Sequence, residues 1–569
     1  MHWVDWLQLL LVLTIITLLA KPLGLYLCKV LDPTAATFLD RPLKWLEKGI
    51  YHLCGIDPRK EHDWKQYLSC TLWFSFASVL ASAGIFLLQR ILPWNPQGFG
   101  SLSWDLNLNT AISFMTNTDW QSYGGETTMS YFSQMGALAV QNFASAAVGL
   151  SAAAALVRGL ARKETESIGN FWADVVRVSL YVLLPISMIS ALFFMSQGVP
   201  QNLSAYVSAH TVEGGQQLIA QGPIASQEAI KILGSNGGGF MNANSAHPFE
   251  NPTPLTNFVQ VILILLIPSA QIYYFGKTIQ NIRHARCIFA ALGVLFVAGV
   301  WICAGSEFTG NPDWSSLGIL GANWEGKEQR FGIFNSALYA CTTTAVSCGS
   351  VNCMHDSFTP IGGLIPMLNI QLSEVIFGGV GAGLYSVLIF VLIAIFIAGL
   401  IIGKTPEYLG KKIEVLEIKM IVLAILPYVF IVHLFTCLGC SSEWGTSALG
   451  NQGPHGFSEI LYAFSSCGAN NGSAFAGIST NTPIYNVTLA LAMLCGRFCC
   501  LAPVLVLAGS LAKKKIHPKT AGSFPVSSLI FITLLVCIIL LIGALTFIPA
   551  LTMGPILEQF ELLRGVLYP

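Results

Sequence analysis

The chain has 569 residues, and charged types make up only 10% of them, against about 25% in an ordinary soluble domain. Hydrophobic types make up 54% and the mean hydropathy is +0.63, which excludes a water-soluble globule, because so much apolar surface requires a bilayer as solvent. The formal net charge is zero and the longest basic block is Lys513 to Lys515, so a nucleic-acid partner is also excluded.

Ten apolar stretches are long enough to cross about 30 Å of hydrocarbon, which takes about 20 residues. The N-terminal stretch lacks the basic region and cleavage site of a secretory signal, so we expect it to remain as the first span. The predicted spans are 4–27, 67–92, 128–157, 171–196, 255–276, 287–305, 368–402, 415–437, 483–511 and 526–550.

The distribution of Lys and Arg predicts the orientation of these spans. Of the 29 Lys and Arg residues, 21 lie in five alternate connecting segments, which are 28–65, 158–170, 277–286, 404–419 and 513–519. Because cytoplasmic loops are enriched in Lys and Arg, we expect these segments in the cytoplasm and both termini outside.

The outward segments contain four interruptions rich in Gly, Asn, Ser and Thr, at 114–126, 232–248, 345–357 and 465–477. Measured from Thr116 to Gly234, Gly349 and Gly468, the intervals are 118, 115 and 119 residues, which indicates an internal repeat. The predicted organisation is an extra N-terminal helix with a cytoplasmic loop (1–65), four repeats (66–160, 170–284, 285–403, 413–512) and an extra C-terminal helix (525–569).

Backbone of this composition is costly in hydrocarbon unless protein buries it or it lines a water-filled cavity. Four equivalent interruptions therefore predict one shared central cavity, the alternative being four ordinary exterior loops. A short helix precedes the interruptions: Ser226 caps one that stops at Gly234, and Ser458 caps one ahead of Gly468. Helix C-terminal ends carry about half a negative charge, so four converging ends favour a cation.

The residues after these short helices are small and, apart from Asp119, uncharged. Backbone carbonyls in such loops can replace the hydration shell of a weakly hydrated monovalent cation, whereas calcium or magnesium would require several carboxylates. The predicted filter consists of Thr116, Asn117, Thr118, Asp119, Gly234, Ser235, Asn236, Ser347, Cys348, Gly349, Ser466, Cys467, Gly468 and Gly472.

Several long motifs resemble the potassium-binding, channel-like A subunit family of the bacterial Kdp potassium-transporting ATPase. They are TNTDWQSY, GSNGGGFMNANSAHPFENPTP, SCGSVNCMHDSFTP, GPHGFSEILYAFSS and NNGSAFAG. The resemblance implies an all-α polytopic fold of the potassium transporter superfamily, with four M1-P-M2 repeats whose re-entrant pore loops surround a central filter. It also implies capture of external K⁺ in the bacterial inner membrane.

By the same resemblance, ATP and Mg²⁺ act on a separate P-type ATPase catalytic subunit, with an accessory single-span subunit and a small membrane peptide as further partners. This chain would need no cofactor, and it contains no DKTGT phosphorylation sequence. Two points stay open. Either Gly468 or Gly472 is the sensitive glycine of the fourth loop. Asp119, where the family more often has Asn, is either a carboxylate near the mouth or a hydrogen-bonded cap.

Ionisable groups inside the spans are functional hypotheses. Glu374 precedes several glycines in the stretch 368–402, which is too long for one straight helix, so we expect a break there. Arg497 below the filter would stop a cation from passing straight through, and Glu374 would draw it sideways; the alternative is an ion pair between the two. We place Gln121 in the same translocation group. Asp174 and Arg177 are expected to pair along one helix turn.

Two other functions stay open. The first is an autonomous potassium channel or cation symporter of the same superfamily. The second is a membrane enzyme, because His247, His355 and His455 lie near outward segments and three histidines can hold a metal. Their contexts favour hydrogen-bonding turn residues.

Overall fold

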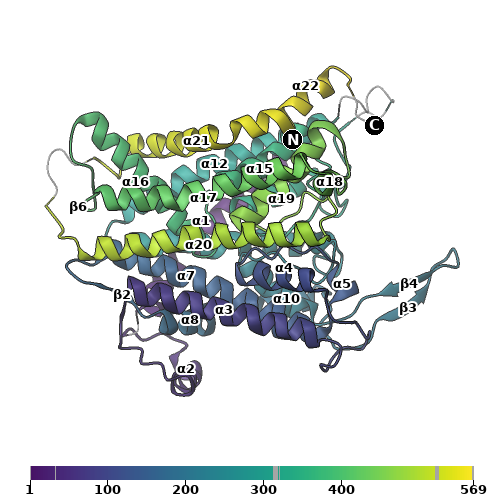
Figure 1. The fold of residues 1–569 in the computed structure, drawn as a ribbon, viewed down its shortest axis with the longest axis horizontal. Helices are drawn as coiled ribbons and strands as arrows, with labels where there is room; N and C mark the ends of the chain where they lie inside the picture. The colour runs from purple at the N-terminus through teal and green to yellow at the C-terminus, as the bar shows by residue number, and fades with distance from the viewer. Residues whose placement is uncertain are drawn as a thin grey trace.

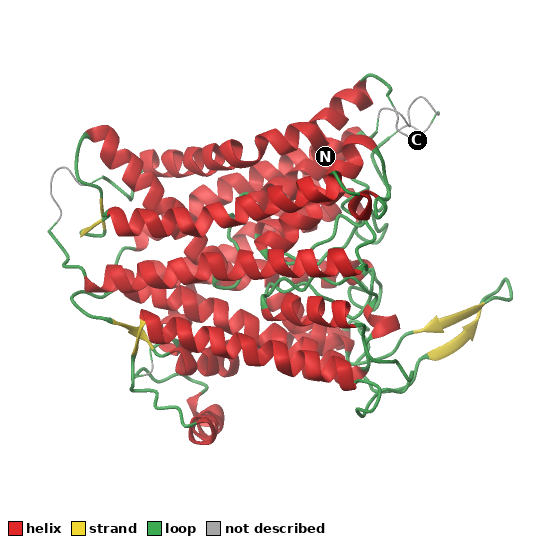
Figure 2. Ribbon diagram, viewed as in Figure 1, coloured by secondary structure: helices red, strands yellow, loops and turns green. Residues whose placement is uncertain are grey.

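The structure is a computed structural model that describes residues 2–32, 34–311, 318, 321–373, 375–518 and 524–566. Helices run across the whole molecule, and the few short strands lie at its two ends (Figure 2). This arrangement is an all-helical bundle whose long axes are roughly parallel (Figure 1).

Within the described residues, ten helical segments are long and apolar enough to cross a membrane, which confirms the predicted number of spans. They are α1 (Trp3–Val30), α3 (Trp64–Leu88), α6 to α7 (Tyr131–Ala161), α8 to α9 (Phe171–Ser196), α11 (Pro254–Thr278), α12 (Ile282–Thr309), α16 (Ala382–Ile402), α17 (Val415–Cys440), α20 (Pro483–Lys513) and α21 to α22 (Leu529–Leu563).

The spans differ in how much of each is buried. In the most apolar 18-residue stretch of each span, 89% of the residues are buried in Tyr131–Ala161 and 78% in Pro254–Thr278, but only 22% are buried in Trp64–Leu88. Small residues allow the central helices to approach closely: a Cβ on Gly159 would lie 2.4 Å from the carbonyl oxygen of Ala508. The first two segments are therefore central, and α3 presents most of its apolar surface outward.

The predicted break in the stretch 368–402 is confirmed. Helix α15 (Pro360–Gln371) ends before the glycines, and α16 begins only at Ala382. Gly381 has a φ of +83°, and a Cβ there would lie 1.9 Å from the backbone of Gly149. Only glycine can occupy this position, because any side chain on residue 381 would overlap the backbone of Gly149 in α7.

Four shorter helices, called half-helices below, lie between the spans: α4 (Trp104–Met115), α10 (Ile224–Leu233), α14 (Gly332–Ala345) and α19 (Gly453–Ala469). The predicted starts at Ser226 and Ser458 are wrong. Helix α10 begins two residues before Ser226, and α19 begins with Pro454 in its first turn, where the fixed φ of proline favours a helix start.

Smaller elements lie at the ends of the bundle. Helix α2 (Asp40–Cys54) and the pairs β1 (His62–Asp63) with β2 (Ser167–Gly169) and β5 (Glu407–Tyr408) with β6 (Lys411–Lys412) lie at one end, and the hairpin of β3 (Val207–His210) and β4 (Gln216–Ile219) projects from the other (Figure 1). Single turns α5 (Gly125–Thr128) and α18 (Glu443–Thr446), and the 3₁₀ turn η3 (Asn244–Ala246), lie in the segments that the sequence predicts to face outward.

The predicted pair between Asp174 and Arg177 is wrong, because each side chain has another partner. Both guanidinium nitrogens of Arg158 contact the Asp174 carboxylate, at 2.6 and 2.7 Å. Arg177 Nη1 lies 3.2 Å from Glu47 Oε1. A bidentate contact from α7 is stronger than a contact along one turn of the same helix, so tertiary partners determine both pairs.

We predict that Asp174→Ala destabilises the fold by about 3–5 kcal/mol, because it leaves the buried Arg158 guanidinium without its carboxylate. The free energy of unfolding of the purified protein in detergent measures this loss. The matched control is Glu61→Ala, which removes the half-exposed partner of Arg162 and should cost less than about 1 kcal/mol. Equal losses in the two variants would contradict the prediction.

Candidate functional site

Each half-helix ends in a residue with a left-handed backbone. The φ angles are +63° at Asn117 after α4, +51° at Ser235 after α10, +58° at Ser347 after α14 and +62° at Asn470 after α19. Short polar side chains, Asn above all, tolerate this region better than most residues. The chain therefore turns sharply at the same place in all four repeats, and the turn directs the next two residues away from the helix end.

These turns meet in one place, and hydrogen bonds join them in order. Asn117 Nδ2 donates to the carbonyl oxygen of Ser235 at 2.8 Å, which links the first loop to the second. The backbone N–H of Gly349 donates to the carbonyl oxygen of Asn236 at 2.9 Å, which links the second loop to the third.

Two further hydrogen bonds close the circle. Ser347 Oγ donates to the carbonyl oxygen of Asn470 at 3.1 Å, and Asn470 Nδ2 donates to Thr118 Oγ1 at 2.9 Å. The four segments 117–119, 235–237, 347–349 and 470–472, called the loop ring below, are therefore joined in cyclic order.

Glycine is required in the loop ring because neighbouring backbones almost touch. A Cβ added to Gly237 would lie 2.2 Å from the backbone of Gly349, and one added to Gly349 would lie 2.8 Å from the carbonyl oxygen of Asn471. On Gly472, whose φ is +91°, a Cβ would lie 1.8 Å from the carbonyl oxygen of Thr118. Three of the four equivalent positions are thus glycine, and Asp119 is the fourth.

The structure brings most of the predicted filter residues into or next to the loop ring. Thr116 and Gly234 cap the half-helices directly before it. Ser466, Cys467 and Gly468 lie in the last turn of α19, outside the loop ring, where Ser466 Oγ accepts a hydrogen bond from the N–H of Gly472.

Of the two glycines left open, the structure places Gly472 in the loop ring. Sequence reasoning missed Gly237, Asn470 and Asn471. Aligning the glycines of Ser-Asn-Gly, Ser-Cys-Gly and Asn-Asn-Gly with Asp119 of Asn-Thr-Asp would have found all three.

An outer cavity of about 770 Å³ lies on one side of the loop ring and is lined by Asp119, Gln121, Gly237, Gly349 and Gly472 among others. Gln121 Nε2 donates to the carbonyl oxygen of Gly239 at 3.0 Å, and Gln121 Oε1 accepts from the N–H of the same residue at 3.0 Å. Gln121 thus ties the first loop to the second at the outer rim.

Asp119 is 2% exposed, and its Oδ2 has no hydrogen-bond partner among the described residues. Among the hydrogen bonds between described residues, no backbone N–H donates to this carboxylate, but the Asn142 side-chain amide, with its nitrogen turned toward Asp119, lies 3.3 Å from Oδ1. Asp119 is therefore a buried carboxyl that lines the outer cavity and has a side-chain hydrogen-bond partner, which is compatible with both alternatives.

A small inner cavity of about 60 Å³ lies on the opposite side of the loop ring, and Asn117, Ser347, Asn470 and Arg497 contribute to its lining. Arg497 Nη2 donates to the carbonyl oxygen of Ser145 at 3.1 Å, and no carboxylate among the described residues forms an ion pair with it. Glu374 lies outside the described residues. A fixed positive charge therefore faces the space directly inward of the loop ring.

Comparisons with known proteins identify the family of this chain. A sequence model of the family described as potassium-transporting ATPase A subunit (KdpA) matches residues 10–560. The chain belongs to this family. Two relatives, each called potassium-transporting ATPase potassium-binding subunit, come from Solibacter usitatus (52% identical, 99% of both chains covered) and Methylorubrum extorquens (53% identical, 94% of this chain and 93% of the relative).

The fold of this A subunit is also similar to the crystal structure of the potassium transporter TrkH from Vibrio parahaemolyticus. The TM-score is 0.53 at 13% identity, covering 88% of this chain and 97% of that one. The two chains thus share a fold.

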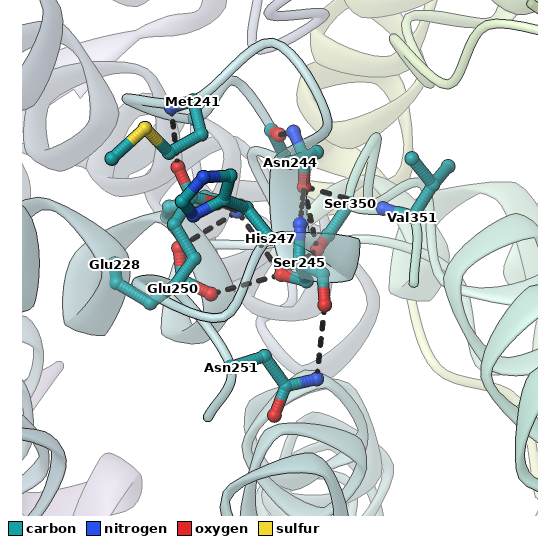
Figure 3. A network of polar contacts seen from close by, with 12 residues as sticks. Glu228, Met241, Asn244, Ser245, His247, Glu250, Asn251, Ser350 and Val351 are labelled. Atoms are coloured by element: carbon teal, nitrogen blue, oxygen red, sulfur yellow. Dashed lines mark hydrogen bonds and ion pairs between the residues drawn. The ribbon is translucent and has the colours of Figure 1, made fainter. Parts of the chain in front are cut away.

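A buried charge network supports the second loop of the A subunit. Lys231 Nζ lies 2.7 Å from Glu228 Oε2 and 2.6 Å from Glu250 Oε2, and all three side chains are at most 1% exposed. Glu250 Oε1 accepts from the N–H of Met241 at 2.7 Å (Figure 3). The segment that follows the loop ring is therefore anchored to α10.

Asn244 connects this network to the loop ring. Its Nδ2 donates to the carbonyl oxygen of Gly237 at 2.7 Å, and its Oδ1 accepts from Ser350 Oγ at 3.1 Å and from the N–H of Val351 at 3.3 Å (Figure 3). Asn244 thus joins the second loop to the residues that follow the loop ring in the third loop.

The three histidines considered as metal ligands have separate partners. His247 Nδ1 accepts from the N–H of Phe249 at 3.0 Å, and His355 Nδ1 lies 2.9 Å from the hydroxyl of Tyr462. His455 lies 2.9 Å from Asp356 and 2.7 Å from Glu558. All three form hydrogen bonds, as predicted, but His455 lies in the first turn of α19 and is not a turn residue.

We predict that His455 stabilises the A subunit more at acidic than at alkaline pH. Burial lowers the pKa of the imidazole, but hydrogen bonds and charges from Asp356 and Glu558 outweigh burial and raise the pKa to about 10. Because this value exceeds that of an unfolded histidine, about 6.5, the stabilisation is complete below about pH 6.5 and declines as the pH rises toward 10.

The measurement is the unfolding temperature of the protein and of His455→Gln across this pH range, with His52→Gln, an exposed histidine on α2, as control. The difference between the protein and His455→Gln should shrink steadily as the pH rises. A difference that does not change with pH would refute the assignment.

Proposed function

We propose that this A subunit binds extracellular K⁺ at the loop ring and passes it on within an ATP-driven uptake complex. The observation that carries the proposal is the closed circle of four backbone segments, three of which contain a glycine, between an outer and an inner cavity. In this proposal the four loops are re-entrant and form the filter.

The chemistry of the loop ring supports K⁺ rather than a divalent ion. Apart from Asp119 its side chains are uncharged, and the close backbones place neutral oxygens around the axis. Such oxygens can replace the hydration shell of K⁺, whereas Ca²⁺ takes six to eight oxygens that include several carboxylates. We propose K⁺ as the only metal ion at the filter, and no cofactor in this chain.

The half-helices add to this preference. All four run with their C-terminal ends toward the loop ring, whose first residues lie one or two positions beyond the helix ends. Each C-terminal end carries about half a negative charge that decays within one turn, so the four ends together attract a cation to the ring.

Below the loop ring, Arg497 supports a path that does not run straight through. Its guanidinium lines the inner cavity together with Gly379 and Val380 of the break between α15 and α16. We propose that this positive charge repels the ion from the straight exit and that Glu374, in the same break, draws it sideways toward a partner.

The relatives' names support the partner, because both are called subunits of a potassium-transporting ATPase. We propose that a separate P-type subunit hydrolyses ATP and binds Mg²⁺, with a single-span accessory subunit and a small membrane peptide in the complex. The protein is a multi-pass membrane protein. We place it in the bacterial inner membrane with both termini outside, on the distribution of Lys and Arg.

We predict that Gly349→Ser and Gly472→Ala weaken K⁺ binding at least about tenfold, or about 1.4 kcal/mol, because an added Cβ displaces the carbonyls of the neighbouring loop. Gly234→Ser should have a smaller effect, since its Cβ meets the end of the Asn236 side chain. Calorimetric titration of the purified chain with K⁺ measures the affinity.

The matched control is Gly293→Ser in α12, where an added Cβ has nothing within 4 Å. Unchanged affinity in both ring variants, with the fold intact, would remove the loop ring as the K⁺ site.

We predict that the chain alone, in liposomes without ATP or partner, conducts almost no K⁺, and that Arg497→Gln increases the flux because it removes the charge below the loop ring. Uptake of radioactive Rb⁺ measures the flux, and Arg162→Gln, at the half-exposed pair with Glu61, is the control. Sustained flux through the unmodified chain would favour the autonomous channel or symporter instead.

A further inference from the structure

Helix α2 (Asp40–Cys54) has two different faces, and only one of them contacts the protein. Leu43, Leu46 and Ile50 are half-buried against the bundle and Glu47 is buried. On the other side Trp45 is 70% exposed. A large apolar side chain that is left this exposed indicates a further contact surface.

Two more apolar side chains extend the exposed face of α2. Leu53 is 87% exposed at the end of the helix, and Phe38 is 77% exposed just before its start. The ring of Phe38 also contacts Tyr26 of α1, with 5.0 Å between the ring centroids. These three exposed apolar side chains, Phe38, Trp45 and Leu53, are called the α2 edge below.

The attachment of α2 fixes its depth relative to the spans. Glu47 accepts hydrogen bonds from Arg177 Nη1 at 3.2 Å and from the Tyr181 hydroxyl at 2.7 Å, and Arg177 Nε donates to the carbonyl oxygen of Val30 at 2.6 Å. Val30 is the last residue of α1. Helix α2 therefore lies at the level where a spanning helix ends.

The direction of α2 differs from that of the spans. In Figure 1 the spanning helices run across the picture, while α2 is seen nearly end-on beside the end of α8. A helix that crosses the bundle axis at the level of the span ends lies in the plane of the membrane surface.

A basic strip runs beside the α2 edge. Arg41, Lys44 and Lys48 are exposed and are three or four residues apart, so they share one side of the helix. Lys44 lies 3.5 Å from Asp40, and ion pairs between Arg41 or Lys48 and other described residues are absent. Their positive charge therefore faces outward.

We propose that α2 is an interfacial helix that binds the anionic phospholipid headgroups of the adjoining leaflet. The α2 edge inserts at the boundary between headgroups and acyl chains, and the basic strip contacts the phosphates. An amphipathic helix with Trp and Leu on one side and Lys and Arg on the other is typical of this position, and each basic residue near an anionic surface strengthens the attraction. The proposal is independent of the ion path.

The test uses the full chain in vesicles of phosphatidylcholine with or without phosphatidylglycerol. The difference in fluorescence between the protein and Trp45→Phe isolates the signal of Trp45. We expect lipids brominated near the headgroup end of the acyl chain to quench this signal more than lipids brominated near the bilayer centre. Brominated phosphatidylglycerol should quench it several-fold more strongly than brominated phosphatidylcholine at equal content.

Replacing the basic strip, with Arg41→Gln, Lys44→Gln and Lys48→Gln together, should remove the preference for phosphatidylglycerol while quenching by phosphatidylcholine persists. The matched control removes three exposed lysines elsewhere, Lys163→Gln, Lys404→Gln and Lys412→Gln, and should leave the preference unchanged.

Three results would overturn the proposal. The first is quenching of Trp45 by aqueous acrylamide and not by brominated lipid. The second is an equal preference for phosphatidylglycerol in the strip variant and the control. The third is shielding of Trp45 only after the partner ATPase is added, which would make α2 a protein-docking surface.

Discussion

The close approach of four backbone segments is the constraint on which the rest of the structure depends. At Gly237, Gly349 and Gly472 an added Cβ would lie within 3 Å of the next loop. No side chain fits between backbones at this distance, so the spacing of the four loops is set by the helices to which they are attached. The half-helices and the spans that enclose them therefore act as a rigid frame around the loop ring.

Buried charges complete this frame at a considerable energetic cost. Glu228, Lys231 and Glu250 are almost completely buried, and desolvating charges is unfavourable unless each has partners. Apolar residues of the same volume could pack there, but they could not accept hydrogen bonds from the N–H of Met241 and the hydroxyl of Ser245. The network thus fixes directions, which hydrophobic packing alone does not.

Hydropathy alone predicted the number of spans, because a span needs about 20 apolar residues whatever its neighbours are. The break before Ala382 was predictable for a similar reason, since glycines interrupt a stretch too long for one helix. The register of the fourth loop was not, because Gly468 and Gly472 look alike in sequence while only one lies beyond the helix end. The partner of Asp174 depended on Arg158 of another span, which no local pattern indicates.

A single chain with four unequal loops can do what four identical subunits cannot. The loop ring has one Asp119 against three glycines, and one Arg497 lines the inner cavity. In a symmetric tetramer each such charge would occur four times, and four guanidinium groups around one axis would expel any cation. One charge instead makes one side of the axis different, so an ion bound at the loop ring, as we propose, would meet an asymmetric space below it. That asymmetry is what a sideways path to a partner requires.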